Sequence, residues 1–193
     1  MRSQARILIL GFLLALGAVP ACQAQGAAQG AFWVAGELGY GSATVNSAVA
    51  AHSKGGLALG FEGGYVFTPM FSLGLRLSGC TLATSNLNDP SKGESLSFVS
   101  MTARVNPLPG QGVFLRGGIG SMRYTNNRPL EWGGSGTGLS LGAGYEFPLR
   151  KRLRVAPVLD LTWSKLDDVD NAVTTIRNRR CKFLSFGINL SFS

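Results

Sequence analysis

The sequence of 193 residues contains a single histidine, and this scarcity excludes most chemistry that depends on an imidazole. His52 is predicted to lie in a loop and on no strand, where a lone histidine is usually solvated, so we expect no catalysis. The sequence also lacks the spacing of metal ligands, phosphate-binding loops and nucleic-acid motifs. We therefore predict no cofactor, no metal site and no nucleic-acid partner.

Cysteine is also rare, and the three cysteines are too few for a disulfide framework. Cys80 and Cys181 are predicted to lie near the ends of two strands that are not neighbours. An exported chain can form a disulfide, but the two Cα atoms would have to come within about 7 Å of each other. The sequence leaves this pairing open.

A long hydrophobic run occurs only at the start of the chain. Two arginines precede an apolar stretch over residues 7–19, which is too short to span a bilayer and is typical of a signal peptide. Small residues favour cleavage after Ala24, and a lipoprotein site at Cys22 is the alternative. We predict a signal peptide over residues 1–24 and one domain over residues 25–193.

Acidic residues are few: the sequence has ten aspartates and glutamates but 18 lysines and arginines, and the formal net charge is +8. For an exported chain, phosphorylated lipid headgroups are a more accessible anion than nucleic acid. The last predicted loop carries Arg177, Arg179, Arg180 and Lys182, and arginine binds phosphate in a bidentate manner. We predict that these four residues contact lipopolysaccharide, with an ordinary solvated loop as the alternative.

The rest of the chain alternates apolar with small or polar residues, which is the period of a strand with two different faces. Glycine, proline, asparagine, aspartate and serine separate the segments, as turns require. Eight strands are predicted, at residues 31–41, 55–67, 71–82, 95–105, 113–124, 137–147, 153–165 and 181–192. Long polar connections alternate strictly with short ones, as in barrels that have short periplasmic turns and long outside loops.

The composition of the two strand faces indicates which face meets lipid. Over residues 71–82, for example, three leucines share one face, and serine, glycine and Arg76 share the other. A soluble barrel would place its large apolar residues inside, and aromatic residues at both strand ends fit membrane interfaces. We predict an all-β, eight-stranded, antiparallel, up-and-down transmembrane barrel with short periplasmic turns and long extracellular loops. A soluble sandwich is the alternative.

Charged residues within the strands fall on the face assigned to the lumen, except Arg123, which lies at the outside end where headgroup phosphates would meet it. Symmetry about the turns predicts that three pairs face each other directly: Glu62 and Arg76, Arg104 and Arg116, and Glu146 and Arg154. The two opposed arginines would need a carboxylate, for which Glu146 is the candidate. The predicted lumen charge network comprises Glu37, Glu62, Arg76, Arg104, Arg116, Glu146, Arg154 and Asp160.

An eight-stranded barrel is about as wide as its own side chains can fill. We therefore expect this network to fill the lumen and to set the strand register, because buried charges must be paired. A gated pore or proton path is the alternative.

The terminal stretch LSFGINLSFS, from Leu184 to Ser193, alternates apolar residues and ends next to an aromatic. With the strand pattern, it resembles the small outer-membrane barrels of the OmpA type and the opacity type. The family's C-terminal insertion signal would be carried here by Phe186, Ile188, Leu190 and Phe192, although Phe192 is penultimate, not terminal. The resemblance implies an outer-membrane location, assembly by the outer-membrane insertion machinery, and a role in envelope integrity, adhesion or surface interaction.

We therefore expect a monomeric structural or surface-interaction barrel without catalysis. Two alternatives remain: a narrow pore for small solutes or ions, and a barrel enzyme that modifies lipid A.

Overall fold

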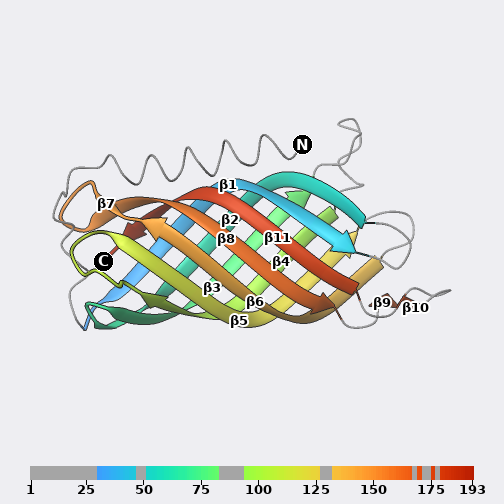
Figure 1. The fold of residues 1–193 in the computed structure, drawn as a ribbon, viewed down its shortest axis with the longest axis horizontal. Coiled ribbons are helices and arrows are strands. Elements are labelled where there is room, and N and C mark those ends of the chain that lie inside the picture. The colour runs from blue at the N-terminus through green and yellow to red at the C-terminus, as the bar shows by residue number, and fades with distance from the viewer. Residues whose placement is uncertain are drawn as a thin grey trace.

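The structure, a computed structural model, describes residues 30–46, 51–82, 94–126, 132–166, 169–170, 175–176 and 179–193. Eight long strands make up most of it (Figure 1): β1 (Phe32–Asn46), β2 (Ala51–Thr68), β3 (Phe71–Leu82), β4 (Glu94–Val105), β5 (Val113–Asn126), β6 (Trp132–Tyr145), β8 (Leu153–Leu166) and β11 (Arg179–Phe192). Three short strands accompany them: β7 (Phe147–Pro148), β9 (Val169–Asp170) and β10 (Thr175–Ile176). The predicted signal peptide lies outside the described residues.

The long strands close into a ring, because β11 pairs with both β8 and β1. Each long strand is antiparallel to its two neighbours in the ring. The predicted eight-stranded antiparallel barrel is therefore confirmed. Among the described residues, no helix is long and apolar enough to cross a membrane.

The strands cross the long axis of the barrel obliquely (Figure 1). Following paired residues once around the ring from Gly144 in β6 leads back to β6 at Gly134, ten residues away. A stagger of this kind requires the strands to tilt by about 35–45° from the barrel axis. With eight strands, the interior that remains is narrow enough for side chains to fill.

Several strands extend further toward the extracellular end than the sequence pattern predicts. β1 reaches Asn46 and β2 begins at Ala51, so most of the predicted first loop is strand. His52 lies in β2 opposite Val45, and the prediction that it lies on no strand is wrong. Backbone pairing continues above the apolar part of the sheet because ladder hydrogen bonds do not depend on side-chain polarity.

The predicted strand over residues 137–147 is interrupted at Glu146. The backbone N–H of Glu146 donates a 2.8 Å hydrogen bond to the carbonyl of Gly112. Gly112 has a φ of 78°, which favours glycine, and a Cβ there would collide with the Glu146 backbone. Because of this interruption, Arg154 pairs with Pro148, and the prediction that it directly faces Glu146 is wrong.

The two faces of the sheet differ as predicted. Large apolar side chains point outward and are exposed, such as Leu75 at 67% and Ile119 at 61%. At the end with the short turns, the ring of Tyr65 makes edge contacts with Phe32 and Phe67 at centroid distances of 5.1 and 5.0 Å. This exterior suits lipid, with aromatic rings at the interface. The inward side chains are buried, and they make up the candidate site.

Candidate functional site: the filled lumen

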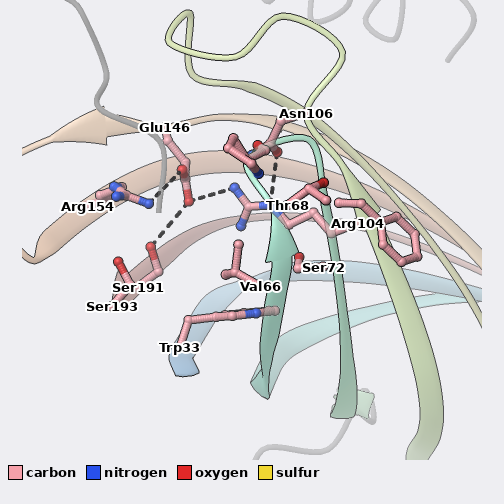
Figure 2. A pocket seen from close by; sticks show the side chains of 12 residues that line it. Trp33, Val66, Thr68, Ser72, Arg104, Asn106, Glu146, Arg154, Ser191 and Ser193 are labelled. Atoms are coloured by element: carbon pink, nitrogen blue, oxygen red, sulfur yellow. Dashed lines mark hydrogen bonds and ion pairs between the residues drawn. The ribbon is translucent and has the colours of Figure 1, made fainter. Parts of the chain in front are cut away.

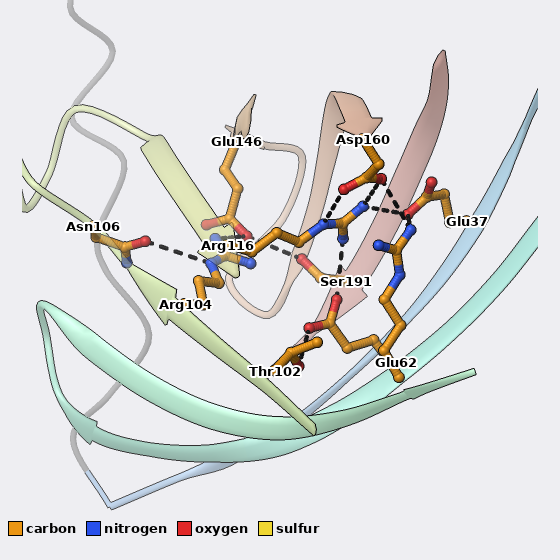
Figure 3. A network of polar contacts seen from close by, with 10 residues as sticks. Glu37, Glu62, Thr102, Arg104, Asn106, Arg116, Glu146, Asp160 and Ser191 are labelled. Atoms are coloured by element: carbon orange, nitrogen blue, oxygen red, sulfur yellow. Dashed lines mark hydrogen bonds and ion pairs between the residues drawn. The ribbon is translucent and has the colours of Figure 1, made fainter. Parts of the chain in front are cut away.

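A cluster of ion pairs, called here the central cluster, crosses the middle of the lumen (Figure 3). It consists of Glu37 (β1), Glu62 (β2), Arg76 (β3), Arg116 (β5) and Asp160 (β8). Arg116 Nη2 lies 2.7 Å from Glu37 Oε2, and Arg116 Nη1 lies 3.1 Å from Glu62 Oε2. Arg116 Nε donates a 2.8 Å hydrogen bond to Asp160 Oδ1, and Nη2 contacts Oδ2. One guanidinium therefore joins three carboxylates from three strands.

Arg76 is the second cation of the central cluster. Its Nη2 lies 2.9 Å from Glu37 Oε2 and 2.9 Å from Asp160 Oδ2. Glu62 stands opposite Arg76 in the β2–β3 ladder, as the turn symmetry predicts. However, the ion pairs of Arg76 reach across the lumen to β1 and β8, and Glu62 accepts a 2.9 Å hydrogen bond from Thr102 Oγ1. Long arginine side chains in so narrow a lumen select partners on distant strands.

A glycine makes room for the two-point contact between Arg116 and Asp160 in this cluster. Gly142 in β6 pairs with Arg116 on one side and with Asp160 on the other. A Cβ on Gly142 would overlap the carboxylate of Asp160 and press against the side chain of Arg116. The missing side chain therefore lets the two ions meet across β6.

A second group of ions, called the mouth cluster, lies toward the periplasmic turns (Figure 2). Arg104 Nη2 lies 2.7 Å from Glu146 Oε1, and Arg154 Nη1 lies 3.5 Å from Glu146 Oε2. Arg104 stands opposite Arg116 in the β4–β5 ladder, and Glu146 supplies a carboxylate to Arg104, both as predicted. This cluster has one carboxylate and two guanidiniums, whereas the central cluster has three carboxylates and two guanidiniums. The eight charges therefore balance.

Aromatic rings hold the mouth cluster in place. The guanidinium carbon of Arg104 lies 3.7 Å from the centroid of Phe114 and 5.8 Å from that of Trp33. Such cation–π contacts are strongest where water is excluded. The cavity beside them, which Ser72 and Ser191 also line, has a volume of about 20 Å³. This is room for about one water molecule, not for a solute.

The outer part of the lumen is mainly apolar, which was not predicted from the sequence. A buried cluster, called here the apolar plug, consists of Ala43, Ala58, Cys80, Leu82, Leu96, Phe98, Met122, Tyr124, Cys181 and Phe183. Both cysteines are free, and Met122 is completely buried. The sequence contains a signal for the apolar plug, because these residues occupy the inward positions in the alternating pattern of their strands. Beyond the plug, Lys54 Nζ lies 2.5 Å from Glu94 Oε1 and joins β2 to β4.

The remaining predicted residues lie on the outer surface or outside the described residues. Arg180 and Lys182 are exposed on β11, Arg179 pairs with Leu166 in the ladder, and Arg177 is not described. Arg180 stands opposite Lys165, a cation that was not among the predicted contact residues. The residues of the proposed insertion signal point outward and are about half exposed: Phe186, Ile188, Leu190 and Phe192. No group of three potential metal ligands occurs among the described side chains.

A closed antiparallel barrel with an aliphatic exterior and ion pairs inside is the architecture of an outer-membrane β-barrel. The sequence matches the family model described as outer membrane protein beta-barrel domain over residues 11–178. The chain belongs to this family, and it is located in the outer membrane.

Solved structures show the same fold. Neisserial surface protein A (NspA) is similar with a TM-score of 0.57 at 15% identity, over 82% of this chain and 96% of that one. Ail, the attachment invasion locus protein of Yersinia pestis, solved with the heparin analogue sucrose octasulfate, is similar with a TM-score of 0.53 at 16% identity, over 86% and 100% of the two chains. No curated protein matches the sequence.

Proposed function

We propose that this protein is a closed, non-conducting barrel with a structural and surface-interaction role in the cell envelope. The observation that carries the proposal is the central cluster, in which Arg116 on β5 joins β1, β2 and β8 through ion pairs inside the lumen. Ions that are fully paired across a narrow lumen leave little room for a permeating solute. The apolar plug adds a barrier of a different kind beyond them.

Recording from planar bilayers tests this role. We expect the refolded protein to give no stable, reproducible open level. A reproducible level, if it shifted when Arg116 or Met122 was replaced by alanine, would identify the lumen as a narrow pore and overturn the proposal. Replacing the lipid-facing Leu75 by alanine is the matched control, because it removes a side chain of similar size from the exterior.

Catalysis is not part of the proposed role. The central and mouth clusters use their carboxylates in ion pairs, and a general acid or base needs a proton that it can exchange with a substrate. The mass of lipid A in cells that express the protein tests this point. We expect no change, and a new mass that depended on expression would support a lipid A-modifying enzyme.

A specific observation favours contact with lipopolysaccharide as a second function. Arg180 and Lys165 face each other across the β8–β11 ladder on the outer surface, and Lys182 follows in the next outward position, opposite Trp163. Like charges directly opposite each other are destabilising unless an anion lies between them. We propose that a lipopolysaccharide phosphate bridges these cations, with Arg177 and Arg179 close by in the chain.

Binding of lipopolysaccharide to the detergent-solubilised protein tests this contact. The double variant R180Q/K182Q is expected to bind about tenfold more weakly, because each lost cation removes a charge-assisted hydrogen bond. The matched control is Lys151→Gln, which removes a charge from a periplasmic turn. Equal binding by the two variants would exclude the contact.

We also propose that the protein is a monomer assembled by the outer-membrane insertion machinery, and the outward apolar residues at the end of β11 support the insertion signal. Replacing Phe192 by alanine is expected to slow insertion without changing the final fold. The fraction of chain that resists unfolding in unboiled samples measures this rate. An unchanged rate would remove the insertion signal from the proposal.

A further inference from the structure

The apolar belt on the outside of the barrel is shorter on one side than on the other. On β3, β4 and β5, the outward apolar residues run over 71–77, 99–105 and 113–119, which is seven residues each. On β2 and β8 they run over 57–67 and 153–163, which is eleven residues each. For strands tilted by about 40°, these lengths correspond to about 15 Å and about 25 Å along the barrel axis. Only the longer belt matches the apolar band of about 25 Å that is typical of such barrels.

A polar surface takes the place of the missing part of the belt. We call it the serine surface, and it consists of Ser95, Ser97, Ser121, Arg123, Ser135 and Thr137, all of which are exposed. Arg123 lies at its centre, opposite Ser97 on β4 and Ser135 on β6. The outer ends of the long belts carry Leu57 and Trp163 instead.

Hydroxyl groups and a guanidinium cannot lie against lipid tails without losing their hydrogen bonds. The polar region of the outer leaflet must therefore reach deeper beside β3–β5 than beside β8 and β2. Hydroxyl side chains suit the hydroxyl and ring oxygens of a sugar, and the fork of Arg123 suits a phosphate. The serine surface thus has the donors and acceptors that match a sugar phosphate.

We propose that the serine surface binds the phosphorylated saccharide headgroup of an outer-leaflet lipid, held closer to the bilayer midplane than the headgroups beside β2 and β8. This surface borders the cations of β8 and β11, because Thr137 on β6 pairs with Lys165 on β8, which in turn pairs with Arg180. The two surfaces differ in chemistry, since the β8–β11 surface offers cations and the serine surface offers hydroxyls around one cation. The lipid beside β4–β6 is consequently selected for its sugar as well as for its charge.

Native mass spectrometry of the full chain released from nanodiscs tests the proposal, with phosphatidylcholine as the bulk lipid and diphosphoryl lipid A as the probe. We expect the protein to retain lipid A, and R123Q to lower the retained fraction about tenfold, as expected for the loss of a charge-assisted contact with phosphate. R180Q/K182Q is the control on β11, which lies beyond β6 and β8 from Arg123, and the effect of R123Q is expected to persist in that background. If the unchanged protein and the R123Q variant retained equal fractions of lipid A, the proposal would be overturned.

A second pair of variants tests the role of the hydroxyls without removing charge. S97L/S121L extends the short belt by one outward position on β4 and β5, and we expect it to release lipid A about as strongly as R123Q while the barrel stays folded. Thr44→Leu adds an apolar side chain near the outer end of β1, away from the serine surface, and is expected to leave retention unchanged. If phosphatidylglycerol, which has a phosphate but no sugar ring, displaces lipid A at equal concentration, the saccharide preference is wrong. A dimer in place of the lipid-bound monomer would assign the surface to a second copy and would also overturn the proposal.

Discussion

Replacing Arg116 by methionine tests how much the central cluster stabilises the barrel. The change removes the guanidinium that joins Glu37, Glu62 and Asp160 but keeps a side chain that fills part of the space. The three carboxylates would then share Arg76 alone in a lumen where all of these groups are nearly inaccessible to solvent. Removing one partner of a buried ion pair costs about 3–5 kcal/mol, so we expect the free energy of unfolding to fall by about 4 kcal/mol.

Urea titration of the protein in phospholipid vesicles measures this change through tryptophan fluorescence. The boiled and unboiled mobility of each variant shows whether the barrel has folded at all. Arg180→Met is the matched control, because it removes the same group from an exposed position, where an ion pair contributes less than about 1 kcal/mol. Arg116→Lys keeps the charge but loses the forked guanidinium, so its loss of unfolding free energy is expected to lie between those of Arg116→Met and Arg180→Met.

A double-mutant cycle separates the ion pair from simple loss of volume. Asp160→Asn alone is expected to be destabilising, but its effect in the Arg116→Met background should be smaller by about 1–3 kcal/mol, because the partner has already been removed. If the two effects add, or if Arg116→Met is no worse than Arg180→Met, the lumen ions do not stabilise the fold as argued.

Three further predictions concern other parts of the lumen. Gly144→Ala should destabilise the barrel by about 1–3 kcal/mol in the same urea titration, since its Cβ would lie 2.5 Å from the ring of Phe114, whereas Gly36→Ala, which points into open space, should change little. Cys80 and Cys181 should resist a thiol reagent in the folded protein and react after unfolding, giving two thiols per mature chain if Cys22 is removed with the signal peptide; labelling of the folded barrel would contradict the apolar plug. Glu146→Gln should lower stability by about 1–3 kcal/mol at neutral pH, because Arg104 and Arg154 lose their shared anion. Glu94→Gln at the other end of the barrel should cost less, because its partner Lys54 is partly exposed. Equal losses of stability would contradict the role of Glu146 as the shared anion of the mouth cluster.

The sequence pattern predicts the fold well because strand parity and lipid exposure are one physical constraint. A charge on the lipid face at mid-membrane costs about 2–4 kcal/mol, so residues such as Glu62 and Arg116 are confined to inward positions. The structure places both there, with side chains at 4% and 3% exposure. Turn symmetry likewise gives the register wherever a hairpin is regular, as for Arg104 and Arg116.

The partners of these charges could not be predicted in the same way. Register determines neighbours along the sheet, but Arg76 bonds to β1 and β8 across a closed ring whose curvature no local pattern specifies. The irregular turn beyond Tyr145 is a second case. Its geometry depends on a hydrogen bond between Glu146 and Gly112, which are 34 residues apart in the sequence. The Glu146–Arg154 ion pair survives this change of register because the two side chains are long enough to reach each other.

The central and mouth clusters form one electrostatic unit, and this has a consequence for the role of the barrel. The central cluster lacks one positive charge and the mouth cluster has one in excess, and Arg104 and Arg116 face each other directly where the two clusters meet. A charge removed from either cluster therefore leaves an imbalance for both, so selection for a stable barrel opposes change anywhere in the lumen. The outer surface is under no such constraint, because β4–β6 and β8–β11 present different polar groups to the same leaflet. Functional variation in a barrel of this kind is therefore expected on its exterior and in its outside loops, while the filled lumen maintains the fold.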